Sequence, residues 1–200
     1  MLSFLRKLTA ATPAPVAAPV AAVTPVAEKV DPFMLGLHDA QLSGWFNEET
    51  GELYKGFPVS ADDIVIDVGC GDGGNMQFCG RRGARLIVAD IDGDKIEQAR
   101  QRLSETPARS VECHVTDGNP LPIADGTATR VVSTEVLEHV DDPAQFLAEL
   151  VRVGQSGALY LLSVPHPSSE ELQKDIAAPA YYEKPNHIRI ISEEQFKTMV

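Results

Sequence analysis

The chain has 200 residues, of which 44% are hydrophobic and 23% charged, a composition typical of one folded domain rather than a disordered or collagen-like chain. Its 17 Lys and Arg residues against 29 Asp and Glu residues leave a formal net charge of -12, which opposes nucleic-acid binding through a broad basic surface. The 3 cysteines include no CxxC pair, so they support neither a disulfide framework nor a zinc site and favour a cytoplasmic location.

The N-terminal segment differs in composition from the rest of the chain. Repeated prolines in an Ala/Pro/Val tract prevent a regular helix, so we expect residues 1–30 to form an extended linker. Pro13, Pro15 and Pro19 also interrupt the apolar segment that a signal peptide needs. No run reaches the roughly 20 apolar residues of a membrane-spanning helix. The folded domain is therefore expected over residues 31–200.

The next segment, residues 44–57, is polar in composition but contains Trp45, Phe46, Tyr54 and Phe57. Two interpretations are open for this concentration of aromatic side chains. The segment forms either a helix and turn that pack on a sheet or part of a lid over a ligand. The first interpretation is favoured.

Short β-rich apolar runs alternate with helical ones from about residue 62, which indicates βαβ units. Five runs are expected to be strands: residues 62–68, 85–91, 110–115, 130–135 and 157–164. Apolar spacing predicts helices over residues 92–105 and 142–154, the second with Asp142 and Pro143 at its start. Strands with little alternation that are linked by helices predict a doubly wound, mainly parallel sheet in a three-layer α/β/α fold. Ligands of such sheets bind beyond the carboxyl ends of the strands.

A glycine-rich loop, VGCGDGGN, follows the first of these strands. Gly69, Gly71 and Gly73 form GxGxG, whereas Gly69, Gly71 and Gly74 satisfy GxGxxG. In both patterns the glycines allow a tight turn, a close approach of the backbone to a ligand and a helix N-terminus directed at it. The glycines alone therefore leave two cofactor classes open.

Carboxylates near the strand ends favour a ligand with an ammonium and a sulfonium group over a pyrophosphate. Asp67 lies in the first strand and Asp72 in the loop, where both would repel phosphate oxygens. Asp90, at the end of the second strand, is placed to accept hydrogen bonds from two vicinal ribose hydroxyls. Asp117, after the third strand, is a candidate acceptor for the amine of adenine. Asp92 is a better candidate for the cap of the following helix than for ligand contact.

The order and spacing of these segments resemble the class I S-adenosylmethionine-dependent methyltransferases, in particular the group called type 11. The resemblance extends over residues 62–200 and rests on VIDVGCGDGG, VADID, VTDGNPLPIADG, STEVLEHVDDPAQFLAELVRV and GALYLLSVPHP. It implies a Rossmann-like fold, S-adenosyl-L-methionine as the cofactor and methyl transfer as the activity.

The resemblance also implies which positions bind each part of the cofactor. It assigns the methionine part to Asp67, Gly69, Cys70, Gly71 and Gly73, with Thr134 or Glu135 near the amino group. It assigns the ribose to Asp90 and the adenine to Ile91, Asp117 and Gly118.

The chain departs from the family pattern at two places. Ala128 and Thr129 stand where family members usually have Phe-Asp, and the loss of that Asp is expected to loosen the site without disabling it. The family's C-terminal antiparallel hairpin, its sixth and seventh strands, has no sequence left to form it, so we expect a C-terminally truncated domain. An exposed sheet edge would then need a partner, and a homodimer is one candidate.

Histidines near the strand ends are the candidate general bases. His139, in LEHV, and His166, directly after the fifth strand, are the catalytic candidates, although His139 in the family more often forms part of the pocket wall. For His187 we expect structural capping, and for His114 a structural role. The Pro-rich loop that contains Tyr181 and Tyr182 is a second candidate lid.

The sequence therefore predicts a methyltransferase that acts on a small-molecule or glycan acceptor, at oxygen. The expected partners include neither nucleic acid nor an integral membrane segment. Two alternatives remain open. One is a NAD(P)-dependent oxidoreductase, which the GxGxxG spacing permits but Asp67 and Asp117 oppose. The other is a non-catalytic cofactor-binding protein, which the departures at Ala128 and Thr129 favour.

Overall fold

The computed structural model describes residues 32–200 except residues 175 and 185. The Ala/Pro tract that was expected to be a linker lies outside the described residues. The first described element is helix α1, Pro32–Leu42. None of the helices in the described part of the chain is long and apolar enough to cross a bilayer.

A five-stranded sheet forms the centre of the fold, and all of its strand pairs are parallel. Its strands are β4 Ile64–Val68, β5 Arg85–Asp90, β6 Ser110–Val115, β7 Ala128–Thr134 and β8 Gly154–Ser163. They lie in the order β6-β5-β4-β7-β8, so the chain starts in the middle, extends to one edge and then crosses back to the other. The point of reversal lies between β4 and β7, where a ligand of a doubly wound sheet binds beyond the carboxyl ends. The predicted parallel sheet is confirmed.

Alternation along the strands creates one apolar core on each face of the sheet. Val65 and Val88 belong to one core, and their neighbours Ile66 and Ile87 belong to the other. Because successive side chains of a strand point to opposite faces, continuous apolar runs bury both faces at once.

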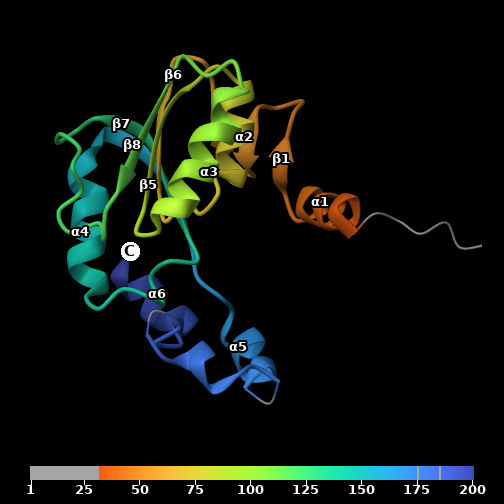
Figure 1. The fold of residues 1–200 in the computed structure, drawn as a ribbon, viewed down its shortest axis with the longest axis vertical. Coiled ribbons are helices and arrows are strands. Elements are labelled where there is room, and N and C mark those ends of the chain that lie inside the picture. Colours follow the sequence, from red (N-terminus) through yellow and green to blue (C-terminus); the bar gives the residue numbers. More distant parts are fainter. Residues whose placement is uncertain (1–31, 175, 185) are drawn as a thin grey trace, which may run out of the picture.

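Helices cover both faces, as the predicted three-layer arrangement requires. Helices α2, Gly74–Arg81, and α3, Gly93–Ser104, pack on one face, and α4, Pro143–Val153, packs on the other (Figure 1). Asp142 caps α4 by accepting a hydrogen bond from the backbone N–H of Gln145, with Pro143 as the first helical residue. Asp92 caps α3 in the same way, as expected. The predicted helix boundaries are therefore confirmed to within a residue.

The prediction of a helix and turn over residues 44–57 is wrong. This segment forms a small antiparallel sheet of β1 Trp45–Asn47, β2 Glu52–Tyr54 and β3 Phe57–Pro58. Glycines in the left-handed region, Gly51 and Gly56, make the turns. Leu53 and Phe57 are buried in the core on the α2 face, Tyr54 packs against it while partly buried, and Lys55 is exposed. In a strand every second side chain points to the same face, so a largely polar segment can still bury its few apolar side chains.

The chain after β8 lies beyond the carboxyl edge of the sheet, next to the loops that follow the strands (Figure 1). It contains α5 Pro167–Gln173, a short 3-10 helix Pro179–Tyr182 and α6 Glu193–Met199. Phe196 packs against the core on the α4 face and so anchors α6. In the described part of the sheet β8 is an edge strand, and its Leu159 and Tyr160 are partly exposed.

Candidate active site

A cavity of about 520 Å³ opens at the carboxyl edge of the sheet. Its walls come from the ends of β4 and β5, the loops after β6 and β7, the start of α4 and the segment before α6. The predicted site residues that line it are Gly69, Asp90, Ile91, Asp117, Gly118, Glu135 and His139. The predicted site residues outside the lining are Asp67, Cys70, Gly71, Gly73, Thr134 and His166.

The glycine loop between β4 and α2 holds a conformation that side chains would disturb. Gly69, Gly71 and Gly73 all have positive φ, at 80°, 53° and 78°. A Cβ at Gly69 would lie 2.2 Å from a methyl carbon of Val136, whereas a Cβ at Gly71 would have no neighbour within 4 Å. The loop is therefore pressed against the chain that leaves β7 at its first glycine, and the space beside its second glycine is open.

Asp90 joins the loop to the end of β5. Its carboxylate accepts hydrogen bonds from the backbone N–H of Gly71, at 2.8 Å, and of Asp92, at 3.0 Å. Next to it, the side chain of Ile91 is 71% exposed although it is apolar. Both residues line the cavity, so a carboxylate and a free apolar surface stand side by side.

Asp67 lies beneath the loop and is 2% exposed. Its Oδ1 has no hydrogen-bond partner among the described residues. Burial, with a contribution from the charge of Asp90, raises the pKa of Asp67 to about 7. A buried carboxyl oxygen without a donor is a site where a proton or a ligand would be favoured.

Cys70 has no features of a nucleophile. Its thiol donates a hydrogen bond to the carbonyl oxygen of Gly71, and burial raises its pKa. Because the thiolate is the reactive form, this cysteine is expected to be inert.

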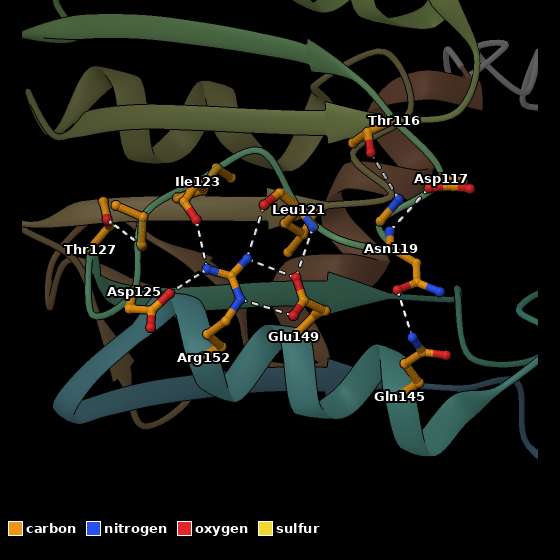
Figure 2. A network of polar contacts seen from close by, with 12 residues as sticks. Thr116, Asp117, Asn119, Leu121, Ile123, Asp125, Thr127, Gln145, Glu149 and Arg152 are labelled. Atoms are coloured by element: carbon orange, nitrogen blue, oxygen red, sulfur yellow. Dashed lines mark hydrogen bonds and ion pairs between the residues drawn. The ribbon is translucent and has the colours of Figure 1, made fainter.

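The loop after β6 contributes Asp117, Gly118 and Asn119 to the cavity and is held from the side by α4. Figure 2 shows the Arg152 guanidinium donating to the carbonyl oxygens of Ile123 and Leu121. Arg152 also forms ion pairs with Asp125 and Glu149. The side-chain amide of Gln145 donates a hydrogen bond to the side chain of Asn119 and so holds the loop at a second point. This network was not predicted from the sequence. Its only local signal is the i, i+3 spacing of Glu149 and Arg152.

The chain that leaves β7 turns sharply into the cavity. Glu135 has a φ of 57°, which is unusual for a residue with a side chain, and its carboxylate accepts a hydrogen bond from the Ser163 hydroxyl. Thr134, the last residue of β7, lies outside the cavity lining. At the position where Asp is usual in the family, the Thr129 hydroxyl bridges strands by donating to Asp63 and accepting from the backbone of Ile64.

The two catalytic candidates have different places. His139 lines the cavity, and its ring packs edge-to-face on His187 with 4.7 Å between ring centroids. His166 is the N-cap of α5, where its Nδ1 accepts from the backbone N–H of Ser168. His187 does not cap a helix, contrary to expectation. Its Nδ1 lies 2.9 Å from a carboxylate oxygen of the buried Glu170, which is distant in sequence.

Several residues of the cavity were missed. The motif that contains His139 also contains Val136, Val140, Asp141 and Phe146. Their closeness to His139 in the sequence is a signal from which they could have been predicted. Lys184 lines the cavity and forms an ion pair with Asp141. No local pattern marks it, because the path of the chain after β8 alone brings it there.

The family described as "methyltransferase domain" matches residues 66–162. A probable S-adenosylmethionine-dependent methyltransferase of Mycolicibacterium smegmatis is 32% identical over 129 residues, which are 64% of this chain and 48% of that protein. The ubiquinone biosynthesis O-methyltransferase of Hahella chejuensis is 37% identical over 95 residues, 47% of this chain and 40% of that protein. The chain thus spans less than half the length of these relatives.

The fold is also similar to solved structures. A SAM-dependent methyltransferase from Aquifex aeolicus superposes with a TM-score of 0.59 at 19% sequence identity, covering 86% of each chain. At that identity the likeness concerns the fold.

Proposed function

Residues 66–162 belong to the methyltransferase-domain family, and from this premise we propose that the chain binds S-adenosylmethionine in the cavity and methylates a small-molecule or glycan acceptor at oxygen. The fold is Rossmann-like, and the match to the methyltransferase-domain family covers its central part. The choice of acceptor and of the methylated atom is our proposal.

The charge of the cavity is the observation that carries the proposal. Among the described residues, the charged side chains that line it are the carboxylates of Asp90, Asp117, Glu135, Asp141 and Asp142 and the ammonium of Lys184. A sulfonium and an ammonium group are attracted to such a site, whereas the pyrophosphate of a dinucleotide is repelled. The cavity therefore favours S-adenosylmethionine over a nicotinamide cofactor.

Each part of the lining suits one part of this cofactor. Asp90 would accept hydrogen bonds from the two ribose hydroxyls, and the exposed side chain of Ile91 would pack on the adenine. Asp117 would accept from the adenine amine, and Glu135 would face the ammonium of the methionine part. The open space at Gly71 would allow the methionine part close to the backbone.

S-adenosylmethionine supplies an activated methyl group when it is bound. The chain's task is then to hold the acceptor oxygen in line with that methyl group. His139, at the wall of the cavity, is the proposed acceptor of the hydroxyl proton. The position of His166 at a helix N-cap gives no support to its proposed role as a base. The ubiquinone biosynthesis O-methyltransferase supports oxygen as the methylated atom, whereas a norajmaline N-methyltransferase of Rauvolfia serpentina is also similar to this chain.

Calorimetric titration with S-adenosylhomocysteine and with NAD tests the cofactor. We expect binding of the first alone, and Asp90→Ala should weaken it by roughly 1.5–3 kcal/mol because a charge-assisted acceptor is lost. Asp94→Ala, which removes the same charge from the first turn of α3 outside the cavity lining, is the matched control. Binding of NAD without S-adenosylhomocysteine would overturn the proposal.

Turnover tests the acceptor. A radioactive methyl donor should label a hydroxyl-bearing small molecule or glycan, and label on nitrogen or carbon would refute methylation at oxygen. Cofactor binding with no labelled product from any acceptor pool would favour the non-catalytic alternative.

A further inference from the structure

Three metal-ligating side chains meet at the wall of the cavity. One ligand atom each of Glu138, His139 and His187 lies within 4.8 Å of the other two. Glu138 and His139 follow β7, whereas His187 lies in the segment between the 3-10 helix and α6. His139 also lines the cavity, so the cluster is next to the space where the acceptor is proposed to bind.

Glu138 is the member of the cluster that calls for a partner. The residue is 1% exposed, and neither carboxylate oxygen has a hydrogen-bond partner among the described residues. The nearest group of opposite potential charge is Nε2 of His139, 3.8 Å from Oε1 and beyond hydrogen-bond distance. Buried polar groups are almost always satisfied, so two unsatisfied oxygens in one carboxylate indicate a missing cation or proton.

His187 is oriented as metal-binding histidines are. The Nδ1 of His187 is hydrogen-bonded to the buried carboxylate of Glu170 at 2.9 Å, which leaves Nε2 as the nitrogen available to a metal. A carboxylate behind a ligating imidazole sets the tautomer and makes the ring a better ligand. Tyr181 packs on the same ring, with 4.4 Å between centroids, and restricts its rotation.

The backbone brings the two ligand segments together without any metal. The N–H of Ile188 donates to the carbonyl oxygen of Glu138 at 3.0 Å. The Arg189 guanidinium donates to the carbonyl oxygens of Leu137, Val140 and Asp141. These hydrogen bonds hold the two ligand segments together before an ion binds. Ion binding would therefore not have to order the segments, which lowers its free-energy cost.

We propose that Glu138, His139 and His187 bind one divalent transition-metal ion of the zinc class at the wall of the cavity. Two imidazoles and one carboxylate are a ligand set that suits Zn²⁺ and Co²⁺, whereas Mg²⁺ prefers oxygen ligands. Three protein ligands leave a coordination position open, as in catalytic zinc sites.

The open position has a use that rests on the proposed function. An acceptor hydroxyl bound there would lose its proton to solvent water more readily, because the ion stabilises the alkoxide. Its oxygen would then form a bond to the methyl carbon while the carbon–sulfur bond breaks, and the bonding pair would leave with sulfur as S-adenosylhomocysteine. With the ion bound, His139 is a ligand and no longer the proton acceptor proposed above, and the hydroxyl proton passes to solvent water before the methyl group is transferred.

Metal titration of the chelator-treated full chain tests the site. We expect one equivalent of Zn²⁺ to bind by calorimetry and Co²⁺ to give a visible d–d absorption band. Glu138→Gln and His187→Ala should each weaken the binding 10-fold or more. The control His114→Ala removes the histidine of a second His–Glu pair, in β6, and should leave the binding unchanged.

The outcomes separate this inference from the proposed function. Absence of stoichiometric Zn²⁺ and Co²⁺ binding, or equal binding by the variants and the parent, would overturn the metal site even if S-adenosylhomocysteine binds. Stoichiometric binding of Mg²⁺ without Co²⁺ would overturn the assignment to a transition metal. Metal binding that depends on Glu138 and His187, in a chain that does not bind S-adenosylhomocysteine, would support the site and refute the proposed function.

Discussion

Asp67 combines a position inside a parallel strand with almost complete burial. Burial raises its pKa from the usual 3.8 to about 7, so the folded state favours the neutral carboxyl group. The corresponding stability is fully present below pH 4 and is lost as the pH rises through 7. Above that pH, the folded chain without cofactor holds a carboxylate that would be better solvated in the unfolded chain.

We therefore predict that Asp67→Asn stabilises the cofactor-free chain at pH 8 but not at pH 4. The gain in the free energy of unfolding should be on the order of 2–4 kcal/mol at pH 8, since each pKa unit corresponds to about 1.4 kcal/mol. Urea unfolding at both pH values measures it. The matched control is Asp62→Asn, at an exposed position of the preceding turn. Equal gains for both variants would contradict the role of burial.

The same substitution is expected to weaken cofactor binding, because the resemblance to class I methyltransferases assigns Asp67 to the methionine part of the cofactor. Stability and function would then oppose each other at one residue, as is common in binding sites. The buried Glu138 is a second example. Its two carboxylate oxygens have no hydrogen-bond partner among the described residues, which lowers stability but leaves them available to the proposed metal ion.

The glycine loop depends on two separate physical requirements. The first is a positive φ, which Gly69 and Gly71 share, and the second is a close approach to Val136, which only Gly69 has of these two. Alanine at Gly71 should lower the free energy of unfolding by about 1–2 kcal/mol, the cost of the left-handed region. Alanine at Gly69 should lower it by about 2–4 kcal/mol, because overpacking against Val136 is added.

Chemical denaturation of the two variants measures this difference. The effect of alanine on the unfolded chain is common to both and cancels in the comparison. A smaller loss at Gly69 than at Gly71 would show that the loop relaxes away from Val136. The open space at Gly71 is proposed to receive the methionine part of the cofactor. Alanine at Gly71 should therefore also weaken the binding of S-adenosylhomocysteine by more than the loss of folding stability accounts for.

Helix α4 positions the loop after β6 through Arg152. This side chain holds the carbonyl oxygens of Leu121 and Ile123, and its pairing with Glu149 keeps the pKa of that carboxyl below its usual range. Arg152→Ala should cost about 2 kcal/mol of stability, because Glu149 loses its charge partner and the carbonyl groups lose their donors. Amide hydrogen exchange over residues 118–126 should become faster, and S-adenosylhomocysteine should bind less tightly.

The control is Arg100→Ala, which removes an exposed i, i+3 pair with Glu97 on α3. Such surface pairs contribute little. If the two variants had the same exchange rates in residues 118–126, the positioning role of Arg152 would be refuted.

At the level of the whole domain, the cavity collects groups from the carboxyl ends of β4, β5, β6 and β7. A ligand that binds there should stabilise the folded chain as a unit. At 100 times its dissociation constant, S-adenosylhomocysteine should add about 2.7 kcal/mol and raise Tm by about 5–10 °C. Scanning calorimetry measures the shift, with NAD at the same concentration as the control.

Hydrogen exchange with bound S-adenosylhomocysteine should show protection after all four strands together. Protection limited to one strand end would contradict a cofactor that spans the edge of the sheet.

Predictions from sequence succeeded where the physical cause is local. The strands and their order of appearance, the caps at Asp92 and Asp142 and the glycine loop all depend on neighbouring residues. The prediction failed for residues 44–57, because strand pairing overrode the helix expected there. Within the site, Asp90 and Asp117 could be predicted because Asp90 ends β5 and Asp117 lies just after β6, and parallel strands end at one edge.

The sequence by itself thus determined the doubly wound sheet, the strand-end carboxylates and the glycine loop, since periodicity, caps and glycine spacing are encoded within short segments. Only the tertiary structure decided that Lys184 enters the cavity, that Arg152 holds the loop after β6 and that His187 meets Glu138 and His139. These contacts join segments far apart in the chain. Their partners are chosen by how the packed layers and the chain after β8 come together, which no local pattern encodes.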